Sequence, residues 1–490
     1  MRRPLAFLLA VTTSACAVGP AYKRPPAPVP AEFKEQPAPG EWKQAEPSDA
    51  SARGKWWEVF GDPLLNGLED QVSVSNQTLA QTEAQYRGAR AAARGAHAPL
   101  FPALTAGGSA DRSRASGNRP GTAPGTASPI SNDFQASADL TYEIDVWGRI
   151  RRSVEANVAS AQASAADLES VRLFLHAELA VDYFLLRGLD AQKQLLDTTA
   201  AAYEKALDLT VNRYNQGVVS GVDVAQARTQ LYTTRAQAVD LSISRAQLEH
   251  AIAILVGKAP AQLSIDPAPE PGKVPPIPRA VPSELLERRP DIAAAERRVA
   301  SANAQVGAAT AAFFPTLLLT VTGGFEAATV SKWFNWPSRF WSLGASVLQT
   351  LFDGGKRRAA TEQARANFDA AVAAYRQSVL NAFLEVEDSA AALRLLAEES
   401  ALQADAVTSA EKALTLARDR YQGGITTYLE VVTAQNTALI NERVSVEIAT
   451  RRMTSAVNLV KALGGGWRAS DMPGVGAVLS REAGAGAKQP

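Results

Sequence analysis

The sequence predicts a mixed, mainly α-helical fold that is internally duplicated, with two long antiparallel helical hairpins and four β-strands. Three observations predict this fold. Motifs in the first half of the chain recur in the second half at matching spacing, two very long stretches consist of helix-forming residues, and shorter stretches alternate apolar with polar side chains.

Composition excludes several classes of function. The chain of 490 residues has 50 Lys and Arg against 50 Asp and Glu, so no net field attracts a nucleic acid. A single Cys excludes a disulfide framework, and three dispersed His residues (His97, His176 and His250) are expected to be ordinary surface or packing residues. Neither a Ser beside a His nor a Gly-x-Ser-x-Gly elbow is visible. We therefore expect no enzyme and no metal.

The amino terminus has the layout of an export signal that ends at a lipid-attachment site. Arg2 and Arg3 precede an apolar run at residues 5–11, which is too short to span a bilayer. Small residues then lead to Cys16, in an arrangement that resembles the bacterial lipobox, where the Cys becomes the acylated first residue. We expect residues 1–15 to be removed and Cys16 to carry a covalent lipid, with no other cofactor. An ordinary signal peptide with a chance Cys is the alternative.

The duplication is read from paired motifs. Arg213-Tyr214-x-x-Gly217 matches Arg420-Tyr421-x-x-Gly424, and Ala227 and Ala434 follow the two Tyr residues at the same distance. A repeat of this length is a whole domain-sized unit, which predicts pseudo-twofold symmetry instead of a solenoid.

Each repeat contains an unusually long helical hairpin. Residues 356–422 contain neither Gly nor Pro, and residues 151–216 contain only Gly188. At 1.5 Å per residue, each helix would reach about 100 Å. A helix of that length needs a partner, which we expect to be the following segment, where heptad-spaced apolar residues are interrupted at Thr234 and Arg245.

At the other end of each repeat the pattern changes to period two. Between Phe134 and Val146, apolar side chains alternate with polar ones, which is typical of a transmembrane β-strand with one face toward lipid. The polar face would carry Asp139, Glu143 and Asp145 toward a water-filled lumen and favour cations. A loop with Trp333, Phe334 and Trp336 in the second repeat fits an interfacial aromatic girdle. Four strands of a soluble sandwich are the alternative.

Four strands cannot close a barrel, since about eight is the smallest number known in membranes, and open strand edges are not tolerated in lipid. Three copies would supply a 12-stranded transmembrane β-barrel continuous with an α-helical barrel.

The chain resembles the TolC-like outer-membrane factor family, in its branch of lipoproteins of resistance-nodulation-division (RND) efflux systems, also called the NodT type. The residues that carry the resemblance are Cys16-x-Val18-Gly19-Pro20-x-Tyr22, Lys55-Trp56-Trp57-x-x-Phe60-x-Asp62-Pro63-x-Leu65, the two Arg-Tyr-x-x-Gly motifs and Leu351-Phe352-Asp353-Gly354-Gly355.

The resemblance implies a homotrimeric, passive channel in the outer membrane of a Gram-negative bacterium, with its tunnel in the periplasm. It implies a periplasmic adaptor protein and an inner-membrane RND pump as partners, outer-membrane lipid around the barrel, and small toxic compounds as cargo. A structural coiled-coil envelope lipoprotein and the duct of a type I protein secretion system are the alternatives.

By the same resemblance, Leu429 and Glu430 form the periplasmic gate, although Glu430 would also favour the start of a helix electrostatically. Tyr214, Asp223 and Tyr421 are the candidates for a latch that holds neighbouring hairpin tips together.

The predicted organisation follows. Residues 1–15 are a signal peptide, 16–50 a Pro-rich lipid-anchored tether, 51–265 the first repeat, 266–289 a linker, 290–463 the second repeat and 464–490 a flexible tail. Strands are expected at about 100–112, 132–147, 316–326 and 340–352, and hairpins at about 151–256 and 356–463.

Overall fold

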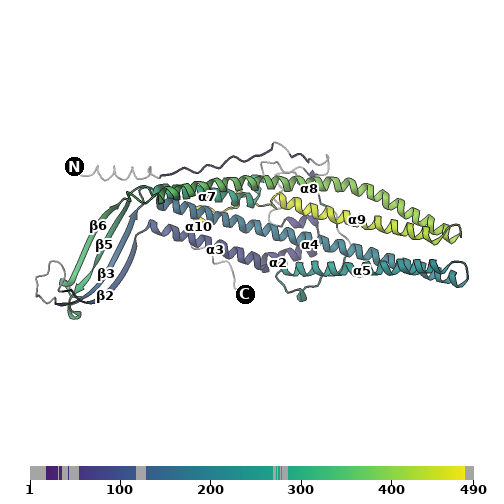
Figure 1. Ribbon diagram of the computed structural model, residues 1–490, viewed down its shortest axis with the longest axis horizontal. Coiled ribbons are helices and arrows are strands. Elements are labelled where there is room, and N and C mark those ends of the chain that lie inside the picture. The colour runs from purple at the N-terminus through teal and green to yellow at the C-terminus, as the bar shows by residue number, and fades with distance from the viewer. Residues whose placement is uncertain are drawn as a thin grey trace.

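The computed structural model describes residues 18–30, 33–35, 42–43, 55–116, 129–268, 272, 274–275, 277–278 and 285–480. The molecule is elongated, with a four-stranded sheet at one end and two helical hairpin tips at the other (Figure 1). Among the described residues, no helix is both long and apolar enough to cross a membrane.

Two hairpins of equal length dominate the molecule. The first pairs α4 (Arg149–Asn215, 67 residues) with α5 (Gly221–Leu255, 35 residues), and the second pairs α8 (Lys356–Gln422, 67 residues) with α9 (Tyr428–Ala462, 35 residues). The matching lengths confirm the internal duplication. Each 67-residue helix extends about 100 Å, so the tips lie far from the sheet.

A shorter helix precedes the strands in each repeat. These are α3 (Gln77–His97) in the first repeat and α7 (Pro290–Ala311) in the second. α2 (Pro63–Ser75), which begins at an Asp62 cap, lies before α3. The remaining short elements are η2 (Trp56–Phe60), η3 (Ala98–Leu100), η4 (Pro260–Gln262), α6 (Leu285–Arg288), η6 (Val330–Lys332), η7 (Trp336–Ser338) and the parallel pair β1 (Trp42–Lys43) with β4 (Ile277–Pro278).

The main sheet is antiparallel throughout, in the order β2-β3-β5-β6. Its strands are β2 (Ala103–Arg114), β3 (Ile130–Ile144), β5 (Thr316–Ala327) and β6 (Arg339–Leu348). The four predicted strands are therefore present, but β3 ends at Ile144 instead of 147 and β6 at Leu348 instead of 352. In both places an Asp beyond the strand prepares the next helix.

The heptad-spaced apolar residues of α5 are the ones that pack against the rest of the bundle. Val224, Leu231 and Ile252 are buried against the rest of the bundle. Thr234, expected to break the pattern, is buried as well, and its hydroxyl donates to the carbonyl of Gln230. Arg245 does break the apolar run, because its guanidinium reaches a buried ionic network instead.

The Arg245 network fixes the start of the linker between the repeats. Arg245 lies 2.6 Å from Asp190 on α4 and 2.6 Å from Glu249, and it donates to the carbonyl of Ile265. Arg187 adds a second cation to the buried Asp190. Removing one member would leave an uncompensated buried charge, which typically destabilises by about 3–5 kcal/mol.

The described part of the Pro-rich segment, residues 18–30 and 33–35, is extended, as predicted, but it lies against the helices instead of hanging free (Figure 1). The backbone N–H of Val18 donates to the carbonyl of Trp147, and Tyr22 hydrogen-bonds to Glu296 on α7. Phe33 packs against Phe383 on α8.

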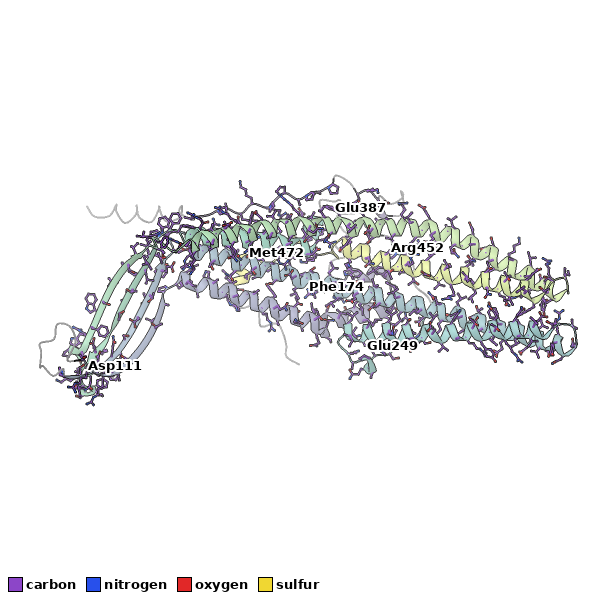
Figure 2. The ribbon with its side chains drawn as sticks, in the orientation of Figure 1. Asp111, Phe174, Glu249, Glu387, Arg452 and Met472 are labelled. Atoms are coloured by element: carbon purple, nitrogen blue, oxygen red, sulfur yellow. The ribbon has the colours of Figure 1, made fainter. Side chains whose placement is uncertain are left out.

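The Glu387 carboxylate holds the far end of this segment by accepting from the N–H groups of Lys34 and Glu35, at 2.7 and 2.8 Å. Figure 2 shows Glu387 on the side of α8 where the segment runs.

The expected flexible tail is wrong for residues 464–480. This segment forms η8 (Ala469–Asp471) and α10 (Val475–Leu479), and Val478 is fully buried beside Ala93 of α3 and Val158 of α4. Arg90 donates to the carbonyl oxygens of Ala477 and Ser480. The segment lacks enough apolar surface to fold alone, but contacts with α3 and α4 supply what is missing.

Candidate functional site

The sheet has one apolar and one polar face. Paired residues in adjacent strands lie on the same face, and Leu140 pairs with Leu104 and Val321. The apolar face is well exposed, since Trp341 and Leu343 on β6 leave 77% and 65% of their surface accessible. Apolar side chains on this face include Leu104, Ala106, Ala110, Phe134, Ala136, Ala138, Leu140, Tyr142, Leu317, Leu319, Val321, Phe325, Trp341, Leu343 and Val347.

Asp139 and Glu143 both lie on the polar face, as the alternation predicted. Asp139 accepts hydrogen bonds from the hydroxyls of Thr322 and Ser137, at 2.7 and 2.9 Å. Glu143 receives two hydrogen bonds from Arg149, at 2.7 and 3.1 Å, so most of its charge is compensated. Asp139 is therefore the stronger candidate for a charged lumen residue.

Asp145 is not a strand residue, which corrects the prediction of three lumen acids on one strand. Its carboxylate accepts from the backbone N–H groups of Ile150 and Arg151, at 3.0 and 2.8 Å, and pairs with the Arg151 side chain. Asp353 does the same before α8, accepting from the N–H of Arg357 and pairing with its side chain. Both Asp residues thus satisfy exposed donors at the start of a long helix.

The Arg-Tyr-x-x-Gly motif is the sequence of a Schellman helix end. In the first tip, the N–H of Val218 donates to the carbonyl of Arg213 and that of Gly217 to Tyr214. The second tip repeats these bonds. Gly217 and Gly424 have φ values of 74° and 72°, a left-handed conformation that favours Gly. The motif therefore reverses the chain sharply at both tips.

Tyr421 lies between the two hairpins. Only 6% of its surface is exposed, and it packs with Ala227 of α5 and with Tyr428, whose ring centroid is 5.2 Å away. The Arg213 guanidinium of the first hairpin lies 4.7 Å from the Tyr421 ring centroid and donates to the Tyr421 carbonyl at 3.1 Å.

The Tyr421 hydroxyl is buried and has no hydrogen-bond partner among the described residues. Tyr421 thus joins the tips through its ring and carbonyl.

The other two latch candidates are arranged differently. Asp223 accepts from the N–H and hydroxyl of Ser220, forming a capping box at the start of α5. Tyr214, the counterpart of Tyr421 in the first repeat, leaves 50% of its surface exposed. The structure therefore does not bring Tyr421 and Asp223 together in a hydrogen bond, and the latch between them stays a prediction.

Leu429 and Glu430 lie in the first turn of α9, with 57% of the Leu429 surface exposed. Glu430 lies 3.6 Å from Arg420 at the end of α8, so the pair closes the second tip across its turn. An exposed ion pair of this kind contributes about 0–1 kcal/mol. Both residues are accessible for a gate, which stays a prediction.

Sequence reasoning missed two tip residues. Arg213 was read only as part of a motif, although it is the cation that touches Tyr421. Gln435 on α9 is 1% exposed, and neither polar atom of its side chain has a partner among the described residues. Burial raises the pKa of Tyr428, which packs against Tyr421, to about 12, so the Tyr428 hydroxyl stays neutral. The residues around Gln435 in the sequence do not indicate that its side chain is buried.

The fold brings a Ser beside a His, although the two are far apart in the sequence. His176 Nε2 is 3.1 Å from the Ser73 hydroxyl, and His176 Nδ1 is 2.6 Å from the buried Glu69 carboxyl. The Trp57 ring stacks on the imidazole, with centroids 4.3 Å apart. Burial raises the pKa of Glu69 well above its ordinary value and lowers that of His176 to about 4, so the surroundings favour the neutral form of both groups. The arrangement fastens α2 to α4.

The fold and these sites define a class of protein, in which a membrane-inserted sheet is joined to a long helical conduit. The chain belongs to the outer membrane efflux protein family, whose model matches residues 68–258 and 281–465. It is accordingly an outer-membrane efflux duct, and its family consists of channels and not of enzymes.

Similar proteins cover nearly the whole chain. Outer membrane protein OprJ of Pseudomonas aeruginosa is 34% identical over 95% of this chain and 97% of its own length. The toluene efflux pump outer membrane protein TtgF of Pseudomonas putida is 32% identical, over 94% and 96%. The solved structure of the outer-membrane channel OprN matches with a TM-score of 0.86 at 32% identity, over 92% of this chain and 100% of that chain.

Proposed function

We propose that the chain works as a homotrimer, in which three sheets close a 12-stranded barrel. The observation that carries the proposal is the sheet order β2-β3-β5-β6, which leaves β2 and β6 with unpaired outer edges. Such edges are not tolerated in lipid, because their N–H and C=O groups would find no partner. Pairing β6 of one copy with β2 of the next satisfies both edges at every junction.

The hairpin tips support the same assembly. Tyr421 of the second hairpin is buried against the first, whereas the equivalent Tyr214 is half exposed. In a ring of alternating first and second hairpins, Tyr214 would meet the second hairpin of the neighbouring copy. The exposed face of one repeat therefore corresponds to the buried face of the other.

The duct would be passive, with a periplasmic adaptor and an inner-membrane RND pump supplying the driving force. Relatives are named as outer membrane proteins of toluene efflux pumps, which supports small toxic organic compounds as cargo. Opening would take place at the hairpin tips, where Leu429 and Glu430 line the entrance. Asp139 from each copy would bias the lumen toward cations.

We also propose that Cys16, which lies outside the described residues, carries a lipid. The backbone N–H of Val18 donates a hydrogen bond to the carbonyl of Trp147, between the end of β3 and the start of α4. In the proposed orientation, this point lies at the periplasmic surface of the outer membrane. Two residues reach at most about 7 Å, so an acylated Cys16 would lie close to that surface. Intact-mass measurement should show acyl chains on the wild type and none on Cys16→Ser, with the trimer retained. An unmodified wild-type Cys16 would exclude the lipid.

The experiment that tests the duct combines native mass spectrometry with planar-bilayer conductance. We expect a trimer that conducts ions in steps. A stable monomer, or a trimer without conductance, would instead support the structural coiled-coil lipoprotein. Crosslinking in cells should capture an RND pump, and capture of a type I secretion transporter would favour that alternative.

A further inference from the structure

Charges in the sheet are separated by face. Every strand acid, from Asp111 at the end of β2 to Glu143, lies on the polar face, whereas the strand bases Arg112, Arg114 and Arg339 lie on the apolar face. The register shows this directly, since Arg339 pairs with Phe325, and Arg112 lies two residues beyond Ala110, the partner of Phe134.

All three Arg residues lie at the strand ends farthest from the helices. β2 ends at Arg114 and β6 begins at Arg339, and Figure 2 shows Asp111 at this far end of the sheet. In the proposed orientation, with helices in the periplasm, this end is the outer rim of the barrel. The three Arg residues thus face lipid at the level of the outer-leaflet headgroups.

Aromatic side chains accompany these bases on the same face. The loop between β5 and β6 folds back so that Trp333 contacts Phe134 and Phe334 contacts Phe325, with ring centroids 5.7 Å apart in both pairs. The Arg339 guanidinium lies 3.4 Å from the ring centroid of Trp336. Aromatic rings of this kind hold a membrane protein at the lipid–water interface.

The three guanidinium groups have unused binding capacity. Within the described chain none of them forms an ion pair, and the indole N–H of Trp333 is buried without a partner. An Arg on a lipid-facing surface costs about 2–4 kcal/mol at the bilayer midplane and about 0–1 kcal/mol near the interface. Their position at the rim is therefore tolerable, and an anionic headgroup would convert that cost into attraction.

Closure of the barrel completes the cluster. β6 and β2 are the two edge strands, so in the proposed trimer Arg339 and Trp336 of one copy would lie beside Arg112 and Arg114 of the next, because all four are at the rim end of these strands. Each junction would then bring together three Arg residues and the Trp336 ring, a combination that no single chain provides. Guanidinium groups bind phosphate oxygens in a bidentate manner.

We propose that each of the three protomer junctions binds a phosphate group of a phosphorylated glycolipid of the outer leaflet, with Arg112, Arg114 and Arg339 as ligands. This inference rests on the proposed trimer. The acyl chains of the lipid would lie on the apolar face below Trp341. The lipid would bridge adjacent protomers at the rim.

The test measures binding of bisphosphorylated lipid A to the detergent-solubilised full-length trimer by native mass spectrometry. We expect up to three lipids per trimer. Arg112→Gln/Arg114→Gln/Arg339→Gln should bind at least about tenfold more weakly, because charge-assisted hydrogen bonds to phosphate are lost. The corresponding triple Lys variant, which keeps the charge without the bidentate geometry, should lie between the two.

The control for the triple Gln variant removes positive charge far from the rim of the barrel. Arg228→Gln/Lys412→Gln changes two exposed cations of the periplasmic helices and should leave lipid binding unchanged. Unaltered affinity of the triple Gln variant would overturn the proposal. So would displacement of the lipid by equimolar inorganic phosphate, because the site would then be one for free anions.

Failure of this inference is distinguishable from failure of the duct. A conducting wild-type trimer without bound lipid would overturn only the rim site. A wild-type chain that remains monomeric would overturn the trimer and, with it, the junctions.

Discussion

Replacing Tyr421 by Phe tests how the two hairpin tips are held together. The Tyr421 hydroxyl is buried and has no partner among the described residues, whereas the ring contacts Arg213 and Tyr428. An unpaired buried hydroxyl costs about 1–3 kcal/mol, and water would satisfy it once the tips separate. Tyr421→Phe should therefore stabilise the closed tips by up to about this amount in each protomer.

The contrasting change is Arg213→Gln. It removes a cation from the face of the Tyr421 ring and a charged donor 3.1 Å from the Tyr421 carbonyl. A charged hydrogen bond contributes about 1.5–3 kcal/mol, and about 1.4 kcal/mol corresponds to a tenfold change in an equilibrium. The open population should therefore rise by at least about tenfold.

Single-channel recording in planar bilayers separates these expectations. Tyr421→Phe should keep or lower the open probability of the wild type, and Arg213→Gln should raise it. Tyr214→Phe changes the equivalent residue, which is half exposed within one chain and faces the neighbouring copy in the proposed ring, so its effect on open probability reports the junction between copies and not the contact within the chain. A higher conductance of Tyr421→Phe would refute the reasoning and point to a hydroxyl partner such as Asp223 across a tip interface.

Three further predictions concern stability. Asp145→Ala should lower the free energy of unfolding by about 0.5–2 kcal/mol, visible as a lower thermal midpoint, because α4 loses a cap; an unchanged midpoint would contradict that role. The pKa of His176 is about 4 in the folded chain and about 6.5 in the unfolded one, so between these pH values the folded chain binds fewer protons. In Glu69→Gln, where only the His of the pair can titrate, the free energy of unfolding should therefore rise from pH 4.5 to 6.5. His176→Gln should show the opposite slope above pH 4.5, because the raised pKa of Glu69 favours protons in the folded state; equal slopes would refute the buried pair. Val478→Asp should release α10 and make the carboxyl-terminal segment sensitive to protease, whereas an equally resistant variant would show that polar contacts such as those of Arg90 suffice to hold α10.

Local features of the sequence determined the elements and their repetition. Apolar periodicity separated strands from helices, the scarcity of Gly and Pro set the length of α4 and α8, and the Arg-Tyr-x-x-Gly motifs located both tips. These features act over a few residues, through backbone sterics and hydrogen bonds between near neighbours, so the order of residues suffices to read them.

Tertiary structure decided what each side chain meets. Tyr214 and Tyr421 occupy the same position of the same motif, yet one is exposed and the other buried, because only Tyr421 faces another hairpin of its own chain. Asp145 continues the alternation of β3 but caps α4, and Val478 is buried only because α3 and α4 pack against it. Burial depends on elements far away in the sequence, and no local pattern encodes which of them arrive.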